Sequence, residues 1–148
     1  MANLEGAKSY LRTKVLTASS EELRLMLYDG AIKFSRQAAS TLESGDFEAS
    51  YQAIVRAKKI VLELSSNLNH NLMPELCERL AGLYIFIYQQ LTDANVNRDA
   101  TALNSAIQLL EYERETWQIL LKQMAESQSD TDLSRTQQTA LGSLSTSA

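Results

Sequence analysis

The chain has 148 residues, of which 45% are hydrophobic and 22% charged, with a net charge of -4 and a pI near 5.0. An acidic protein of this kind is poorly suited to neutralising a phosphate backbone, so its charge argues against nucleic-acid binding as the main role. Five glycines and one proline are too few to punctuate a fold of many strands. The composition therefore predicts an all-α protein with one core.

Cysteine content and hydropathy indicate the cellular compartment in which the protein is expected. Cys77 is the single cysteine, which excludes an internal disulfide and is typical of a protein in a reducing environment. We interpret it as a small buried hydrophobe. The opening residues "MANLEGAKSY" lack the apolar run of a signal peptide, and no stretch reaches the roughly 18 apolar residues of a membrane span. We expect a cytoplasmic protein without membrane insertion.

Residues 1–18 carry apolar side chains without a helical period, so we expect an extended or short-helical segment that lies across another surface. The first helix begins at "TASSEEL", where Ser19 is positioned to cap it and Glu22 completes a capping box. It ends near "ESGD", because Gly45 suits the turn that follows a helix. Asp46 is then the expected cap of a second helix over 47–69.

The segment "NHNLMP" separates the second helix from a third, for which Pro74 fits the first turn and Asn95 marks the end. Asp99 is the expected cap of a fourth helix that continues to about Glu126. Short connections between long helices favour an antiparallel four-helix bundle, here over 19–126. Residues 127–148 are rich in Ser, Thr and Gln and predict a disordered tail.

Each predicted helix carries more apolar residues than one buried stripe needs. The rows assigned to the core are Leu23, Met26, Leu27, Gly30, Phe34 and Ala38; Ile54, Ala57, Val61, Leu64 and Leu68; Leu76, Leu80, Leu83, Ile87 and Leu91; and Leu103, Ile107, Leu110, Trp117, Leu121 and Met124. The surplus suggests a homo-oligomer interface, a groove for a partner, or a surface covered by the N-terminal segment. The candidate partner-binding residues are Tyr10, Leu25, Tyr28, Ile32, Tyr51, Val55, Leu62, Tyr84, Tyr88, Tyr112 and Ile119.

The sequence lacks the residue combinations that common catalytic and metal sites require. A ferritin-like di-metal site needs Glu-x-x-His on two helices, and a Ser-His-Asp arrangement needs a well-placed histidine, but His70 is the single histidine and falls in a predicted loop. No glycine-rich phosphate loop is present. Arg114 lies on the predicted core row, and we interpret it as a partly buried guanidinium held by carboxylates or helix-end carbonyls, with its stem packed against Trp117. We therefore expect no enzyme activity, no metal and no cofactor.

Several stretches together resemble the FliS family of flagellar secretion chaperones. "SYLRTKVLTASSEELRLMLYDGAIKF" resembles the family's opening, and "KIVLELSSNLN", "LYIFIYQQLTDAN" and "LLEYERETW" resemble later parts of it in the same order. The resemblance implies a four-helix bundle in the bacterial cytosol that binds the disordered C-terminal region of flagellin. It also implies that binding prevents premature polymerisation, that the client is delivered to the export gate of the flagellar type III apparatus, and that the N-terminal segment can cover the groove.

A second hypothesis remains beside this one. The surplus apolar faces are equally compatible with a homodimeric helical-bundle scaffold or adaptor that has no flagellin client. We expect either a monomer or a weak homodimer in solution.

Overall fold

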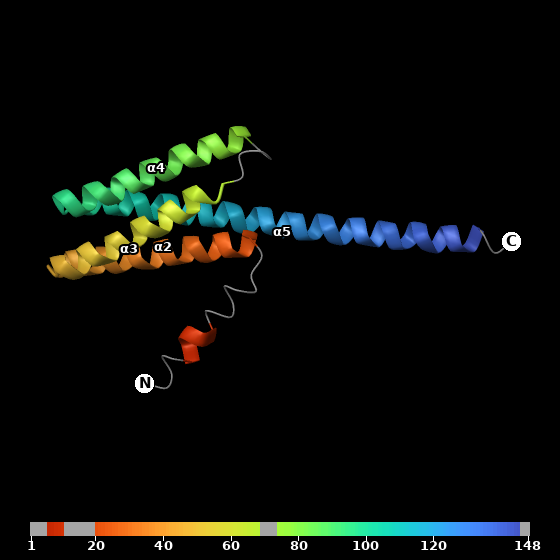
Figure 1. The fold of residues 1–148 in the computed structure, drawn as a ribbon, viewed down its shortest axis with the longest axis horizontal. Helices are drawn as coiled ribbons and strands as arrows, with labels where there is room; N and C mark the ends of the chain where they lie inside the picture. The colour runs from red at the N-terminus through yellow and green to blue at the C-terminus, as the bar shows by residue number, and fades with distance from the viewer. Residues whose placement is uncertain (1–5, 11–19, 69–73, 146–148) are drawn as a thin grey trace. The chain divides into compact units, whose positions relative to one another are not determined.

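A computed structural model describes residues 6–10, 20–68 and 74–145 of the chain (Figure 1). Four long helices follow one another, namely α2 (Ser20–Glu43), α3 (Phe47–Ser66), α4 (Pro74–Asn97) and α5 (Ala100–Ser145). Residues 6–10 are helical as well, and the described part of the chain contains no strand. The prediction of an all-α fold is confirmed.

The chain divides into two compact units, Met1–Arg114 and Glu115–Ala148. The first holds α2, α3, α4 and the beginning of α5, and consecutive helices run in opposite directions (Figure 1). This is the antiparallel arrangement expected from short connections between long helices. None of the described helices has the length and apolar character that crossing a membrane would require.

The turns between helices follow the predicted chemistry. Gly45 adopts a positive φ of 81° after α2, which a glycine does without strain. The Asp46 side chain then accepts a hydrogen bond from the amide of Ala49 at 3.2 Å and caps α3. At α5, Asp99 accepts bonds from the amides of Thr101 and Ala102 at 3.0 and 3.1 Å. Ser19, the expected cap of the first helix, lies outside the described residues.

The predicted core rows of α3, α4 and early α5 are largely confirmed. Their buried members are Ile54, Ala57, Val61, Leu64, Leu80, Ile87, Leu91, Leu103, Ile107 and Leu110. Cys77 is buried, as expected of a small hydrophobe. Further along α5, Trp117 and Leu121 are half-buried and Met124 is exposed, so the assignment of Met124 to the core is wrong.

Most of the predicted core row of the first helix is wrong, although Ala38 is buried as predicted. The buried stripe is Arg24, Tyr28, Ala31, Ile32, Ser35 and Ala38, whereas Leu23, Met26, Leu27 and Phe34 are half-buried. The stripe includes two long polar side chains, Arg24 and Tyr28, whose partners are supplied by other helices. A count of apolar residues favours a neighbouring face of α2 because it cannot include these partners.

The C-terminal part of the chain also differs from the expectation. α5 continues as a helix to Ser145, where we expected a disordered tail from Ser127. Residues 122–142 are all exposed, so this stretch buries no apolar stripe of its own, which is the feature that made the sequence resemble a tail.

Candidate binding surface

A buried arginine fixes three helices to one another. The Arg24 side chain on α2 is 8% exposed, and its Nη1 donates to the Tyr84 hydroxyl of α4 at 3.0 Å and to the Leu64 carbonyl of α3 at 3.4 Å. Its Nη2 donates to the Asn67 carbonyl at 3.2 Å. Carbonyls at a helix C-terminus lack intrahelical partners and carry partial negative charge, so the guanidinium stabilises the end of α3.

Two tyrosines complete this cluster. The hydroxyls of Tyr28 and Tyr84 share a hydrogen bond, and their ring centroids lie 6.4 Å apart. Burial and the charge of neighbouring Tyr84 raise the pKa of Tyr28 above its usual range, and burial also raises the pKa of Tyr84. Both hydroxyls therefore stay protonated and act as fixed hydrogen-bonding groups between α2 and α4.

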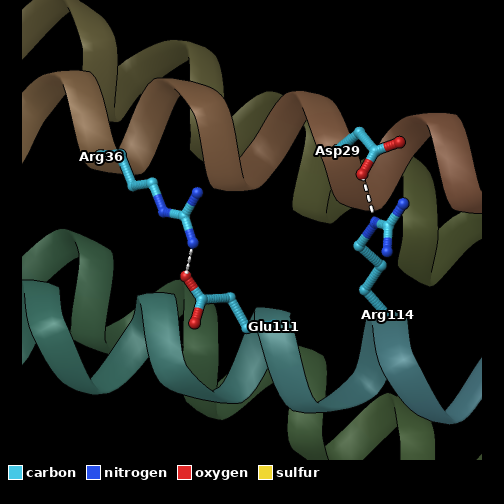
Figure 2. A network of polar contacts seen from close by, with 4 residues as sticks. All are labelled: Asp29, Arg36, Glu111 and Arg114. Atoms are coloured by element: carbon cyan, nitrogen blue, oxygen red, sulfur yellow. Dashed lines mark hydrogen bonds and ion pairs between the residues drawn. The ribbon is translucent and has the colours of Figure 1, made fainter.

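Two ion pairs join α2 to α5 on the outside of the same unit. Figure 2 shows the Asp29 carboxylate paired with Nε of Arg114, and the Glu111 carboxylate paired with Nη2 of Arg36. The Arg114 side chain is 34% exposed, which agrees with the predicted half-buried guanidinium held by a carboxylate. The carboxylate of this ion pair, Asp29, comes from α2. Exposed pairs of this kind stabilise weakly, so their main effect is on the alignment of the two helices.

α3 and α4 both carry large apolar side chains that are exposed or half-buried, and we call these side chains the α3–α4 surface. Tyr51 and Leu62 of α3 are 58% and 53% exposed, and Ile85 and Val96 of α4 are 57% and 74% exposed. Its full membership is Phe47, Tyr51, Val55, Leu62, Ile85, Tyr88 and Val96.

Contacts across the seam show that both helices contribute to this surface. Nζ of Lys58 on α3 lies 4.6 Å from the ring centroid of Tyr88 on α4, and the Asn95 amide donates to the Tyr51 carbonyl at 3.4 Å. At one end, the Arg98 guanidinium lies 3.7 Å from the Phe47 ring centroid, beside a hollow of about 280 Å³ that Phe47 and Tyr51 help to line. Large exposed apolar patches are uncommon on soluble monomers, so these side chains are a candidate protein-binding surface.

The structure places the predicted binding residues in three groups. Exposed at the surface are Tyr10, Tyr51, Leu62, Tyr112 and Ile119. Half-buried are Leu25, Val55 and Tyr88. Tyr28, Ile32 and Tyr84 are buried at 0%, 6% and 1% exposure, so their predicted surface position is wrong. Their place in the core follows from the Arg24 contacts, which turn this face of α2 inward.

Tyr51, Val55, Leu62 and Tyr88 are the predicted residues that lie together on the α3–α4 surface. The sequence-based set omitted Phe47, Ile85 and Val96 of the same surface. The exposed position of Phe47 can be predicted from the sequence, because Phe47 lies on the same side of α3 as Tyr51 and Val55. Ile85 was recognisable as turned away from the core row. Val96 lies near the helix end, where periodicity is weakest.

The comparisons with known proteins agree with this architecture. A family model described as "Flagellar protein FliS" matches residues 1–124. The chain belongs to the FliS family. It is 37% identical over 95 residues to the flagellar secretion chaperone FliS of Bacillus subtilis. The matched region covers 64% of this chain and 70% of the relative. The corresponding chaperone of Salmonella typhimurium is 31% identical over 122 residues, with coverage of 79% and 90%.

A solved structure has the same fold as this FliS-family chain. It is a crystal structure of a flagellar chaperone from bacteria, with a TM-score of 0.67 and 19% sequence identity, and it covers 82% of this chain and 98% of its own. Membership in the FliS family supports a chaperone role in flagellar export and implies a protein that is not an enzyme. Among the described residues, no cluster of His, Cys, Asp or Glu is suited to hold a metal ion.

Proposed function

We propose that this FliS-family protein is an export chaperone of the bacterial cytosol that binds the disordered C-terminal region of flagellin. Binding prevents premature polymerisation and presents the client to the export gate of the flagellar type III apparatus. The observation that carries the proposal is the α3–α4 surface, where large apolar side chains of two neighbouring helices are exposed. The names of the curated relatives, flagellar secretion chaperones, support it.

The energetics of such binding are favourable. Covering an apolar side chain stabilises a complex by about 1.5 to 3 kcal/mol at most. The α3–α4 surface offers Tyr51, Leu62, Ile85 and Val96 as side chains that are more than half exposed before binding. Covering the exposed part of four such anchors contributes roughly 3 to 7 kcal/mol, which offsets the cost of about 2 to 5 kcal/mol for ordering a disordered segment. Micromolar affinity, about 8 kcal/mol, therefore requires additional contacts elsewhere on the bundle. An extended partner with alternating apolar residues fits a surface of this kind.

The other exposed predicted residues belong to the proposal as secondary contacts. These are Tyr10, Tyr112 and Ile119, and the half-buried Leu25 of α2 is included with them. A client that wraps around the bundle would reach several of them. We also propose that residues 1–18 cover part of the binding surface before the client arrives; most of that segment lies outside the described residues. Removing residues 1–16 should then increase the binding of a hydrophobic dye to the folded protein, and unchanged dye binding would contradict this part of the proposal.

The decisive test is calorimetric titration of the full chain with the isolated C-terminal segment of flagellin from the same organism. We expect binding near one to one with a large negative heat-capacity change, the signature of apolar burial. Leu62→Ser on the α3–α4 surface should weaken binding by about tenfold, the effect of losing roughly 1.4 kcal/mol. Leu133→Ser is the matched control, since Leu133 is a similarly exposed leucine, at 63%, and belongs to the other compact unit.

Either of two results would overturn the proposal. One is an absence of binding both by the full chain and by the chain lacking residues 1–16. The other is an equal loss of affinity in Leu62→Ser and Leu133→Ser. If light scattering of the non-binding protein then shows a concentration-independent dimer, the homodimeric scaffold becomes the better account. Binding of the assembled complex to the isolated cytoplasmic domain of the export gate protein tests the delivery step separately.

A further inference from the structure

The other side of α3 carries a second surface, where α3 packs against α2. A Cβ added to Gly30 would lie 3.1 Å from Cδ1 of Ile60, so the Ile60 methyl rests directly against the α2 backbone. One turn along, the Arg56 guanidinium lies 5.6 Å from the ring centroid of Phe34. Leu27, Phe34 and Ile60 are half-buried along this seam. With Gly30 and Arg56 they form what we call the α2–α3 surface.

Three cations lie within one helical turn of Gly30 or Ile60. Lys33 of α2 and Arg56 and Lys59 of α3 are exposed, and none of them forms an ion pair within the described part of the chain. Two carboxylates lie within a turn of these cations on the same helices. Asp29 is already paired with Arg114, and Glu63 follows Lys59 by four residues. In a chain with a net charge of -4, this is a local excess of positive charge beside apolar side chains.

The α2–α3 surface is separate from the α3–α4 surface. At 100° per residue, Arg56 points about 140° away from Tyr51 around the α3 axis, and Ile60 about 160° away from Leu62. A partner on one surface therefore leaves the other accessible. The cation next to the α3–α4 surface, Lys58, is also distinct because it lies over the Tyr88 ring.

We propose that the α2–α3 surface docks an acidic amphipathic helix of a partner protein. Leu27, Phe34 and Ile60 offer apolar contacts along the seam between two helices, which is where a third helix packs its own apolar stripe. Lys33, Arg56 and Lys59 then face carboxylates at the edges of that helix, so charge complementarity sets its orientation and speeds its association. This partner is additional to flagellin, and its binding does not depend on the proposed function.

The same features disfavour other anionic partners. Nucleic acid gains nothing from the half-buried apolar side chains between the cations, and three cations neutralise few phosphates. A membrane surface requires apolar side chains that protrude into the headgroup layer. Leu27, Phe34 and Ile60 are half-buried and do not meet that requirement.

The test uses the full chain and a synthetic helical peptide of Leu, Ala and Glu, with its leucines on one face. Calorimetry should show one-to-one binding that weakens as salt is added, because exposed charges are screened. The variant Lys33→Gln/Arg56→Gln/Lys59→Gln should bind about tenfold more weakly, the combined effect of three charges at the rim of an interface. Its matched control, Lys8→Gln/Lys122→Gln/Arg135→Gln, removes the same charge from exposed positions elsewhere and should bind like the parent.

Three results would overturn the inference. A peptide with glutamine in place of each glutamate that binds equally well would remove the role of charge. An equal loss in the control variant would show that only net charge matters. Binding of vesicles of phosphatidylglycerol and phosphatidylcholine, or of duplex DNA, without peptide binding would assign the cations to a different partner. Calorimetry of the triple variant with the flagellin segment should match the parent, which keeps this test independent of the flagellin proposal.

Discussion

Replacing Tyr28 and Tyr84 by phenylalanine, singly and together, tests whether the Arg24 cluster fixes the bundle. Phenylalanine keeps the ring and its packing, so the change removes only the hydroxyls. Tyr28→Phe leaves the Tyr84 hydroxyl with its Arg24 partner at 3.0 Å and should destabilise the protein by about 1 kcal/mol. Tyr84→Phe removes an acceptor of Arg24 and also leaves the fully buried Tyr28 hydroxyl without its partner.

The magnitudes follow from these two losses. An unmade buried hydrogen bond costs about 1 to 3 kcal/mol, so Tyr84→Phe should destabilise by about 3 kcal/mol. In the double variant the orphaned Tyr28 hydroxyl is gone, and Arg24 keeps its bonds to the carbonyls of Leu64 and Asn67. We therefore expect about 2 kcal/mol for the double variant. That is about 2 kcal/mol less than the sum of the single effects.

Urea unfolding followed by circular dichroism measures the three free energies of unfolding. Tyr112→Phe is the control, because Tyr112 is 67% exposed, and it should change stability by less than about 0.5 kcal/mol. Single effects that add within about 0.5 kcal/mol would show that the two hydroxyls do not depend on each other. The described hydrogen bond would then contribute nothing to the stability of the bundle.

Two further predictions concern charge and backbone. Burial raises the pKa of Glu113, partly offset by Arg79, so the folded state disfavours its ionised form. Glu113→Gln should therefore raise the melting temperature at pH 7. The gain should disappear below about pH 4.5, the usual pKa of this carboxyl, because the parent is then protonated in both the folded and the unfolded state. A gain that persists in acid would contradict the burial effect. Thermal unfolding of three glycine variants should change stability in different directions. Gly45→Ala should lose about 1 kcal/mol of stability because Gly45 has a positive φ, and Gly82→Ala should gain up to about 1 kcal/mol because its Cβ meets open space. Gly30→Ala should leave stability nearly unchanged, because the contact of the new Cβ with Ile60 offsets the gain in helix propensity. Equal effects at the three sites would refute this explanation.

The parts of the fold that depend on local chemistry could be predicted from the sequence. Gly45, Asp46 and Asp99 act within a few residues of their own positions, and the structure shows each of them at the predicted turn or cap. The core rows of α3 and α4 are recognisable because polar residues separate them from the flanking row. Periodicity is sufficient where one side of a helix is clearly more apolar than the others.

The orientation of α2 could not be predicted in this way, because two sides of the helix are similarly apolar. The choice between them depends on Tyr84, Leu64 and Asn67, which lie at least 40 residues further along the chain and provide the partners of Arg24. Arg24 and Tyr28 lower the apparent hydrophobicity of the face that is in fact buried. The same long-range contacts explain why Tyr28, Ile32 and Tyr84 were wrongly placed at the surface.

The inward turn of Tyr28 also changes where a partner can bind. With Tyr28 and Ile32 in the core, Gly30 and Phe34 of α2 lie against Ile60 and Arg56 of α3. Tyr51, Leu62, Ile85 and Val96 of α3 and α4 are more than half exposed. α3 thus contributes to two different surfaces, one apolar and one that includes exposed cations. Since Arg24 anchors the end of α3 and Tyr84 anchors α4 to the same cluster, both surfaces are built on fixed elements. A partner that binds such a preorganised surface loses less affinity to ordering of the protein than one that must also arrange the helices.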